Sequence, residues 1–285
     1  MGQGVGMTRT LYSDFESIDD VMSVLDQDLP SGSSQASRDS EPREGWDLSL
    51  GYDGALEAYT GGWAEGASKA YELAEHLAPK PKSTRTSLSR SVSGAFPNVG
   101  AYLAGAPNAM YRVSKKAAQG RPYVHLYVPI SYSSSVHADT AFDRGCAIVA
   151  LIDALETSGC RVKVTCTRTS EMKVGGCPKL VMRFMVKDYQ DRLDIDQLIF
   201  TVAHPAFFRR IVFALQERSE YGKARDSTCR GYGTPADLVE DDCPVDGGNS
   251  IRVMFPRLEG QHGTPETFLR EMVKVLPEDL QTEIN

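Results

Sequence analysis

The stretch Tyr123–Ile130, YVHLYVPI, decides the fold, because it is a short apolar run rich in residues that favour β-strands. A polar turn, Ser131–Ser135, follows it, and His137–Glu156 then carries apolar residues at helical spacing. Gly159 lies where the C-cap of that helix belongs, and Arg161–Thr167 alternates like a second strand. We therefore predict a strand, a helix and a second strand in direct succession.

The alternation continues to the end of the chain. Strands are predicted at Lys179–Val186 and Ser250–Phe255, and helices over Pro205–Ser219 and from Thr264 through Val275. Strands that alternate with helices predict an α/β fold with a mostly parallel central sheet and helices on both faces. This is a Rossmann-like arrangement.

Two further helices are predicted upstream. SDFESIDDVMSVLDQDL has apolar residues at helical spacing, with Ser13 as N-cap and Glu16 completing a capping box. WAEGASKAYELAEHL is the second, and its predicted apolar face consists of Trp63, Ala67, Tyr71 and Ala74.

Three regions are expected along the chain. Residues 1–45 form an acidic, partly disordered N-terminal arm, and residues 46–122 join a helix to a basic segment rich in Gly, Ser and Pro. Residues 123–285 form the α/β domain. Fifteen Asp and Glu fall within the first 75 residues, and residues 30–45 have the composition of a flexible linker.

Composition points to a protein of the cytoplasm. The chain has 285 residues, a hydrophobic fraction of 41% and a net charge of −7, which suits one large domain with extensions. Its apolar runs are too short to span a bilayer, and no secretion signal begins it. The six cysteines have no Cys-x-x-Cys spacing, so we expect free thiols and no zinc site.

A charge gap is the strongest functional signal. From His76 to Ala138 there is no Asp or Glu, although the rest of the chain is acidic. Eight basic residues and several aromatic residues lie inside the gap. Segregated basic charge is typical of a surface that meets nucleic acid, although a solvated basic linker has the same composition.

We interpret the gap as a surface for single-stranded nucleic acid, on which bases stack on aromatic rings while cations track phosphates. The acidic arm is expected to fold over this surface and compete with the ligand. The predicted nucleic-acid-binding residues are Lys80, Lys82, Arg85, Arg90, Tyr102, Tyr111, Arg112, Lys115, Lys116 and Arg121.

The segment after the first strand resembles a von Willebrand factor A-type domain. In that family the strand ends in Asp-x-Ser-x-Ser, and Pro129, Ser131 and Ser133 stand at the corresponding positions here. The resemblance covers the chain from Tyr123 onward and implies the α/β fold. Because Pro129 has no side-chain oxygen, the resemblance implies a degenerate metal loop. We expect no metal and no cofactor, and a serine turn that caps the following helix.

A second resemblance lies upstream. The stretch with Val99, Tyr102, Leu103, Gly105 and Pro107 is similar to one in a family of uncharacterised tailed-phage proteins, where it precedes an A-type domain. The resemblance implies a phage origin and the cytoplasm of a host cell. A structural interpretation is that this stretch is a tight turn that packs its Tyr and Leu onto the sheet.

Three functions stay open. The first is a non-enzymatic phage accessory protein that binds single-stranded nucleic acid in replication or transcription, with a phage polymerase or another protein as a further partner. The second is a protein-interaction adaptor that docks through the loop Ser131–Thr140 of the A-type domain. The third is an enzyme in which His137 and His204 meet in a deep pocket, although no nucleophile elbow or phosphate-binding loop supports it.

Overall fold

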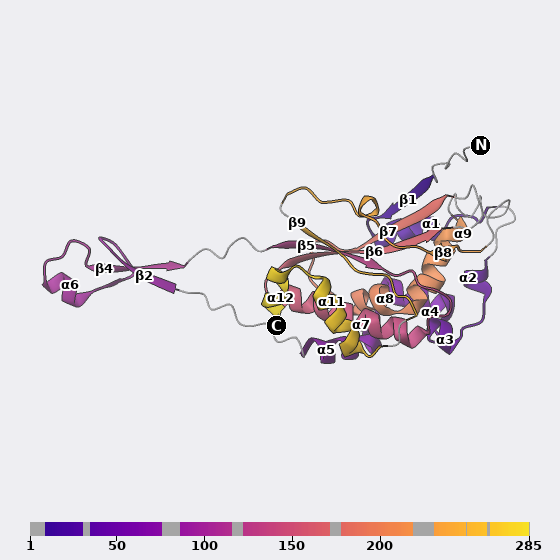
Figure 1. Cartoon of the computed structure of the whole chain (residues 1–285), viewed down its shortest axis with the longest axis horizontal. Helices are drawn as coiled ribbons and strands as arrows, with labels where there is room; N and C mark the ends of the chain where they lie inside the picture. Colours follow the sequence, from indigo (N-terminus) through magenta and orange to yellow (C-terminus); the bar gives the residue numbers. More distant parts are fainter. Residues whose placement is uncertain are drawn as a thin grey trace, which may run out of the picture.

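The computed structural model describes residues 9–30, 35–75, 86–115, 122–171, 178–218, 231–248, 250–260 and 263–284. Within 86–89 and 113–115, and at residue 283, it describes the backbone alone. Figure 1 shows a main body and a small antiparallel unit that lies apart from it.

The main body is built on one sheet of six strands, as counted over the described residues, in the order β1-β7-β6-β5-β9 with β8 paired to β6. Parallel pairs join β1 to β7, β6 to β5 and β5 to β9, whereas β7 and β8 run antiparallel to β6. The predicted α/β fold with a mostly parallel sheet is confirmed. The strands are β1 (Thr10–Phe15), β5 (Tyr123–Pro129), β6 (Arg161–Glu171), β7 (Lys179–Lys187), β8 (Thr234–Pro235) and β9 (Ser250–Met254).

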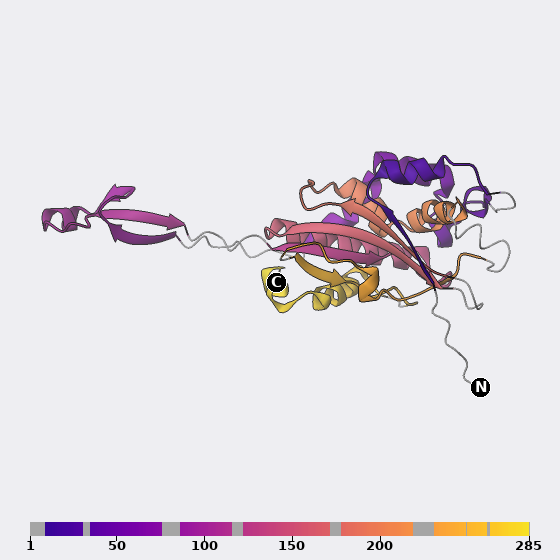
Figure 2. The same ribbon diagram turned by 90° about the horizontal axis from the view of Figure 1, so that it is seen from above.

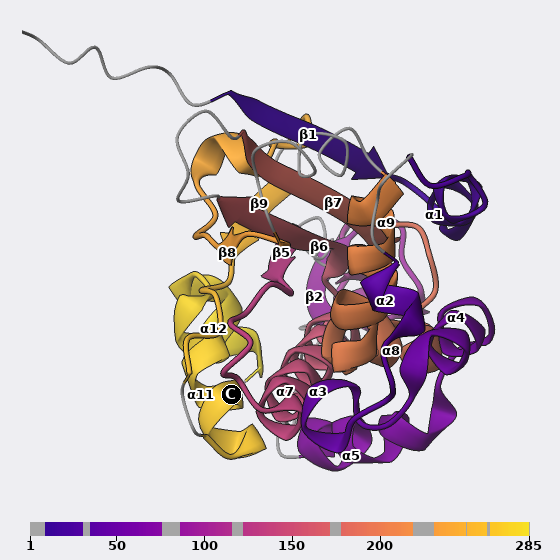
Figure 3. The same ribbon diagram turned by 90° about the vertical axis from the view of Figure 1, so that its right-hand side faces the viewer.

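The two faces of the sheet differ because side chains alternate along each strand. In β5, Val124, Leu126 and Val128 belong to the hydrophobic core, and His125 and Tyr127 point to the opposite face. Helices gather on the apolar face, and the segment that contains η2 (Glu240–Asp242) lies on the polar face (Figures 1 and 3).

Helix α7 (Ala138–Thr157) lies at the centre of the helical layer and packs against α5 (Ala64–Glu75), α8 (Ile195–Ala203) and α11 (Pro265–Val275). Its apolar residues are spread around most of its circumference, which is typical of a helix covered on all sides. The predicted helices at 137–156 and 264–275 are therefore confirmed to within one residue at their ends. The short C-terminal α12 (Glu278–Ile284) also contacts α7.

The N-terminal segment is part of the main body. Strand β1 is an edge strand of the sheet, where the ring of Phe15 stacks on that of Phe184 at a centroid distance of 5.0 Å. Helix α1 (Ile18–Leu25) buries Val21 in the same core. The predicted division into an arm at 1–45 and a domain that starts at 123 is therefore wrong for the described residues.

The predicted start of α1 is wrong as well. Its N-cap is Ser17, whose side chain accepts a hydrogen bond from the backbone N–H of Asp20 at 3.1 Å. Ser13 lies in β1 and Glu16 in the connection that follows it. Ser13 and Ser17 are equally suitable N-cap residues by type. The pairing of Thr10–Phe15 with β7 decides between them, because it places Ser13 in a strand.

Four helices follow α1 in the described part of the chain: α2 (Ala36–Asp39), α3 (Glu44–Asp47), α4 (Gly51–Gly61) and α5. The predicted helix at α5 is confirmed, but its buried face is rotated from the predicted one. Ala67, Ala70 and Leu73 are buried, whereas the side chain of Tyr71 is 51% exposed. Small residues on this face let α5 approach α7 closely.

The helical layer contains a π-helix in the segment that follows α8. Helix α8 was not predicted, and the predicted helix at 205–219 consists of a π-helix, η1 (Phe207–Val212), followed by α9 (Phe213–Arg218). Among the described helices, none by itself is long and apolar enough to cross a membrane, while α8 and Phe207–Arg218 satisfy the criteria only as a pair bent by 62°.

The small antiparallel unit consists of β2 (Thr86–Ser91), β3 (Phe96–Pro97), α6 (Val99–Leu103) and β4 (Met110–Lys115), with the strand order β2-β4-β3. Figure 2 shows it beyond one end of the main body, connected through residues outside the described ranges. The predicted packing of Tyr102 and Leu103 onto the main sheet is wrong, because these side chains are 72% and 79% exposed.

A close approach of α7 and α8 supplies a test of this packing. A Cβ at Gly145 of α7 would lie 2.1 Å from the Cα of Ala203 in α8, so Gly145→Ala must push the two helices apart. We expect the free energy of unfolding to fall by about 1–3 kcal/mol in chemical denaturation. Gly61→Ala is the control, because a Cβ there meets no atom within 4 Å. Equal stability of the two variants would contradict this packing.

Candidate functional site

A row of three side chains crosses one face of the small antiparallel unit. Tyr111 lies in the middle strand, directly opposite Arg90 of β2 and Phe96 of β3. Directly opposite residues of antiparallel strands share a face. The rings of Phe96 and Tyr111 have centroids 5.6 Å apart, and the side-chain amide of Asn98 donates to the Tyr111 hydroxyl at 2.7 Å. The unit therefore presents one cation and two aromatic rings in line.

The structure brings together only some of the predicted nucleic-acid-binding residues. Arg90 and Tyr111 share the row, whereas Arg112 follows Tyr111 and belongs to the opposite face of the unit. Tyr102 lies on α6 and is exposed. The remaining predicted residues, or their side chains, fall outside the described part of the chain: Lys80, Lys82, Arg85, Lys115, Lys116 and Arg121.

The same unit exposes apolar side chains. Val99, Tyr102 and Leu103 of α6 are 63%, 72% and 79% exposed, and Val92 in the preceding turn is 76% exposed. An exposed apolar group of this kind is typical of an interaction surface.

A separate cavity of about 320 Å³ lies at the carboxyl ends of β5 and β6, and we call it the edge cavity. Carboxyl ends of parallel strands are where α/β folds bind ligands. Its lining combines aromatic, hydroxyl and guanidinium groups and, among the described residues, contains no Asp or Glu. Its lining includes Trp46, Tyr132, Ser133, Ser134, Arg168, Phe208, Arg209, Phe213 and Tyr232.

Arg209 is fixed by the backbone around it. Its guanidinium donates to the carbonyl oxygens of Trp46, at 2.5 Å, and Val136, at 2.7 Å. Its central carbon lies 4.0 Å from the ring centroid of Trp46 and 4.8 Å from that of Tyr132. Burial lowers the pKa of Arg209, but a guanidinium stays charged at neutral pH. The cavity wall therefore carries a fixed positive charge between two aromatic rings.

Arg168 enters the edge cavity from β6. Its Nε and Nη2 donate to Gln216 Oε1 at 3.2 and 2.9 Å, and its central carbon lies 5.2 Å from the ring centroid of Phe208. Phe213 and Tyr232 stack beside it, with centroids 3.8 Å apart. Rings and amide together hold this second guanidinium in one orientation.

The serine loop joins two strands. Ser131 donates its hydroxyl proton to the Thr169 carbonyl and accepts from the Thr169 N–H, each at 3.2 Å. Ser133 accepts from the backbone N–H of Ser135. The expected serine cap on α7 is wrong, because the N-cap residue is His137 and no side chain caps it. Among the described residues, no three His, Cys, Asp or Glu side chains gather at a metal site.

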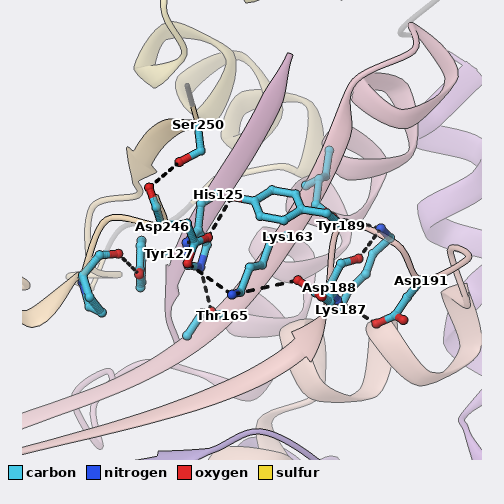
Figure 4. A network of polar contacts seen from close by, with 12 residues as sticks. His125, Tyr127, Lys163, Thr165, Lys187, Asp188, Tyr189, Asp191, Asp246 and Ser250 are labelled. Atoms are coloured by element: carbon cyan, nitrogen blue, oxygen red, sulfur yellow. Dashed lines mark hydrogen bonds and ion pairs between the residues drawn. The ribbon is translucent and has the colours of Figure 1, made fainter. Parts of the chain in front are cut away.

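A polar cluster holds the 236–248 segment to the polar face of the sheet. Figure 4 shows His125, Lys163 and Asp246 pointing toward one another. The Asp246 carboxylate lies 3.0 Å from His125 Nδ1 and 3.3 Å from Lys163 Nζ, and it accepts from the Tyr189 hydroxyl at 2.8 Å. Burial by itself raises the pKa of Asp246. The Tyr189 hydrogen bond and the Lys163 charge act in the opposite direction and outweigh burial, so the pKa lies below its usual value.

Basic residues of this face pair with the same segment. Lys179 of β7 lies 2.7 Å from the buried Asp242, and Arg252 of β9 lies 2.8 Å from Glu240. The acidic stretch 237–246 therefore neutralises the polar face of the sheet. We assign this cluster a structural role.

The two histidines of the enzyme hypothesis serve different purposes. His204 is buried against the ring of Trp63, with centroids 4.3 Å apart, and its Nδ1 accepts from the Ala206 N–H at 3.1 Å. His137 begins α7, and its side chain is 54% exposed beside Asp139. None of the cavities described here is lined by both histidines.

The sequence contains a signal for the edge cavity in two consecutive arginines. Arg209 and Arg210 interrupt the apolar run PAFFRRIVFALQ, where consecutive charges cannot both reach solvent from a covered helix. Arg168 lies in a strand with core residues on either side. Trp46 gave no local signal, because its place depends on contacts with η1.

The model of the family described as "Domain of unknown function (DUF7192)" matches residues 4–277. The chain therefore belongs to that family. No curated protein and no solved structure matches the chain.

The two buried histidines predict a pH dependence of stability. Burial lowers the pKa of both His125 and His204 from 6.5 to about 4. The unfolded chain therefore binds more protons between these values, and each histidine's contribution is complete above pH 6.5 and declines as the pH falls toward 4. We expect the loss to reach about 3 kcal/mol per histidine.

The measurement is chemical denaturation at several pH values between 7 and 4. His204→Gln removes one titrating group, so its unfolding free energy should depend less steeply on pH than that of the unaltered chain. His137→Gln makes the same substitution at an exposed histidine and is the control for the replacement of an imidazole by an amide. A His204→Gln slope equal to that of the unaltered chain would show that His204 is not held neutral.

Proposed function

We propose that this member of the DUF7192 family binds single-stranded nucleic acid through the small antiparallel unit and catalyses no reaction. The observation that carries the proposal is the row of Arg90, Tyr111 and Phe96 across one face of the unit. An aromatic ring that is open to solvent offers a base a stacking surface, and a neighbouring guanidinium offers the phosphate a partner.

Exposure supports this use of the row. Phe96 is 44% exposed at the edge strand, and Arg90 is exposed at the opposite edge. Tyr111, half-buried between them, is held by the Asn98 hydrogen bond. The two outer side chains are therefore free to contact a strand that lies across the sheet.

Charge supports it as well. Residues 86–115 contain three basic residues and no acid, whereas the whole chain has a net charge of −7. Described acidic residues of the N-terminal segment belong to the main body, where Asp14 pairs with Arg183 and Asp47 with Arg210. Competition by a free acidic arm, which the sequence suggested, is therefore not part of this proposal.

A role in phage replication or transcription, with a phage polymerase or another protein as partner in the host cytoplasm, is supported by the sequence resemblance alone. The geometry of the unit itself supports binding to a single strand.

A protein-interaction adaptor is the second candidate. The observation that favours it is the exposed apolar surface of α6, with Val99, Tyr102 and Leu103. The loop at 131–140, which the adaptor hypothesis used, instead lines the edge cavity at Ser133 and Ser134. A protein partner would therefore dock on α6.

Fluorescence anisotropy with a labelled single strand, at salt concentrations from 50 to 200 mM, separates the two candidates. Phe96→Ala should weaken binding about fivefold or more, because a stacked base contributes about 1–3 kcal/mol. Arg90→Glu should weaken binding and lower the slope of log affinity against log salt by about 0.7 for each lost phosphate contact.

Leu103→Ser is the matched control, since it alters an exposed residue of the same unit outside the row. It should leave nucleic-acid affinity unchanged. If the unaltered chain fails to bind single-stranded DNA and RNA at 50 mM salt, the proposal is wrong. If Leu103→Ser weakens binding as much as Phe96→Ala, the row is not the binding surface.

A further inference from the structure

We propose that the edge cavity is a second binding site, which takes a small organic anion made of a phosphate or carboxylate group on a flat ring. This site is independent of the small antiparallel unit. It lies at the carboxyl ends of β5 and β6, whereas the chain connects to the unit before the start of β5.

The charge of the cavity calls for an anion. Arg209 is 1% exposed, and the hydrogen bonds described for it go to backbone carbonyl oxygens. The neighbouring Arg210, equally buried, is paired with the carboxylate of Asp47 at 2.5 Å. Within the described residues Arg209 forms no ion pair, and the Asp47 carboxylate, whose charge raises the pKa of Arg209, is itself paired with Arg210. Burying a cation is costly unless it is paired, so an oxyanion in the cavity would offset that cost.

The geometry of the guanidinium groups favours an oxyanion over a halide ion. Arginine presents its N–H groups in a planar fork that matches the two oxygens of a carboxylate or phosphate. Three backbone carbonyls fix Arg209, and Gln216 orients Arg168. The Nε–Nη2 fork of Arg168 is occupied by Gln216, so this residue contributes its charge, whereas the bonds of Arg209 described here start from Nη1 and Nη2 and do not involve Nε. Both guanidinium groups are held in place before a ligand arrives, which reduces the entropy lost on binding.

The walls of the cavity favour a flat body on that anion. Trp46, Tyr132 and Phe208 place aromatic rings around the two cations. The hydroxyl of Tyr132 is buried and has no hydrogen-bond partner among the described residues. Burial raises the pKa of Tyr132 to about 12, so the hydroxyl keeps its proton and can donate it in a hydrogen bond.

The size of the cavity limits the ligand. A volume of about 320 Å³ lies at the small end of the range for ligand pockets, which is roughly 300–1,000 Å³. One ring with one charged group fits that space, and a folded protein segment or a nucleic-acid duplex does not.

The test uses the full chain and four small probes in isothermal titration calorimetry. Phenyl phosphate and benzoate share a ring and differ in the anion, benzyl alcohol keeps the ring without charge, and inorganic phosphate keeps the charge without a ring. We expect phenyl phosphate or benzoate to bind at least about tenfold more tightly than benzyl alcohol and inorganic phosphate. Whichever of the two binds more tightly identifies the anion.

Two arginines of the same helical segment supply the variants. Arg209→Lys keeps the charge but removes the planar fork, and it should weaken binding about tenfold. Arg218→Lys alters an arginine at the end of α9, outside the lining, whose described bonds go to the carbonyls of Gln27 and Ala214, and it should leave affinity within about twofold. Equal loss in both variants would mean that the effect is on folding, and the next pair of variants then decides.

A second pair of variants lies at two exposed serines and leaves the buried core unchanged. Ser134→Trp places a large side chain at the cavity mouth and should abolish binding, whereas Ser135→Trp alters the adjacent exposed residue, which does not line the cavity. The proposal is overturned if no probe binds the full chain, if benzyl alcohol binds as tightly as the anions, or if Ser134→Trp and Ser135→Trp bind equally.

Discussion

Two consecutive arginines in the π-helix η1 are the constraint on which the main body depends. Arg209 and Arg210 both point inward, and each is 1% exposed. Arg210 donates to the carbonyl oxygens of Ser37, Ser40 and Glu41 and pairs with Asp47, while Arg209 binds the carbonyls at 45, 46 and 136. Removing one partner of a buried ion pair costs about 3–5 kcal/mol, so this junction holds the 35–47 segment to the helical layer.

The same junction explains why a cavity forms beside the sheet. A π-helix widens the turn, which is a feature often found at functional sites. Here the wide turn lets Arg210 pair with Asp47 of the N-terminal segment, while Arg209 donates to the Val136 carbonyl in the loop after β5. The polar face of the sheet is neutralised by the 236–248 segment through Asp242 and Asp246. Positive charge is therefore left at the edge cavity and on the small antiparallel unit.

The sequence was sufficient where structure is local. Strand β5, helix α7 and strand β6 follow from apolar periodicity, since each buries a regular set of side chains. Strand β1 could not be predicted locally, because TLYSDF mixes apolar and polar residues. It becomes a strand of the sheet only by pairing with β7, about 170 residues away. The row across the small unit could be predicted only in part. The composition of the charge gap pointed to Arg90 and Tyr111, whereas the cross-strand register that adds Phe96 exists only in the folded unit.

We propose that two separate surfaces of this chain bind two different anions. Hydrogen–deuterium exchange of the full chain, measured by mass spectrometry with a single-stranded oligonucleotide and then with phenyl phosphate, tests it most directly. The account predicts that the oligonucleotide slows exchange in residues 86–115 and leaves the loop at 131–136 unchanged, and that phenyl phosphate does the reverse. Protection of the same peptides by both ligands, or protection of 86–115 by neither, would contradict it.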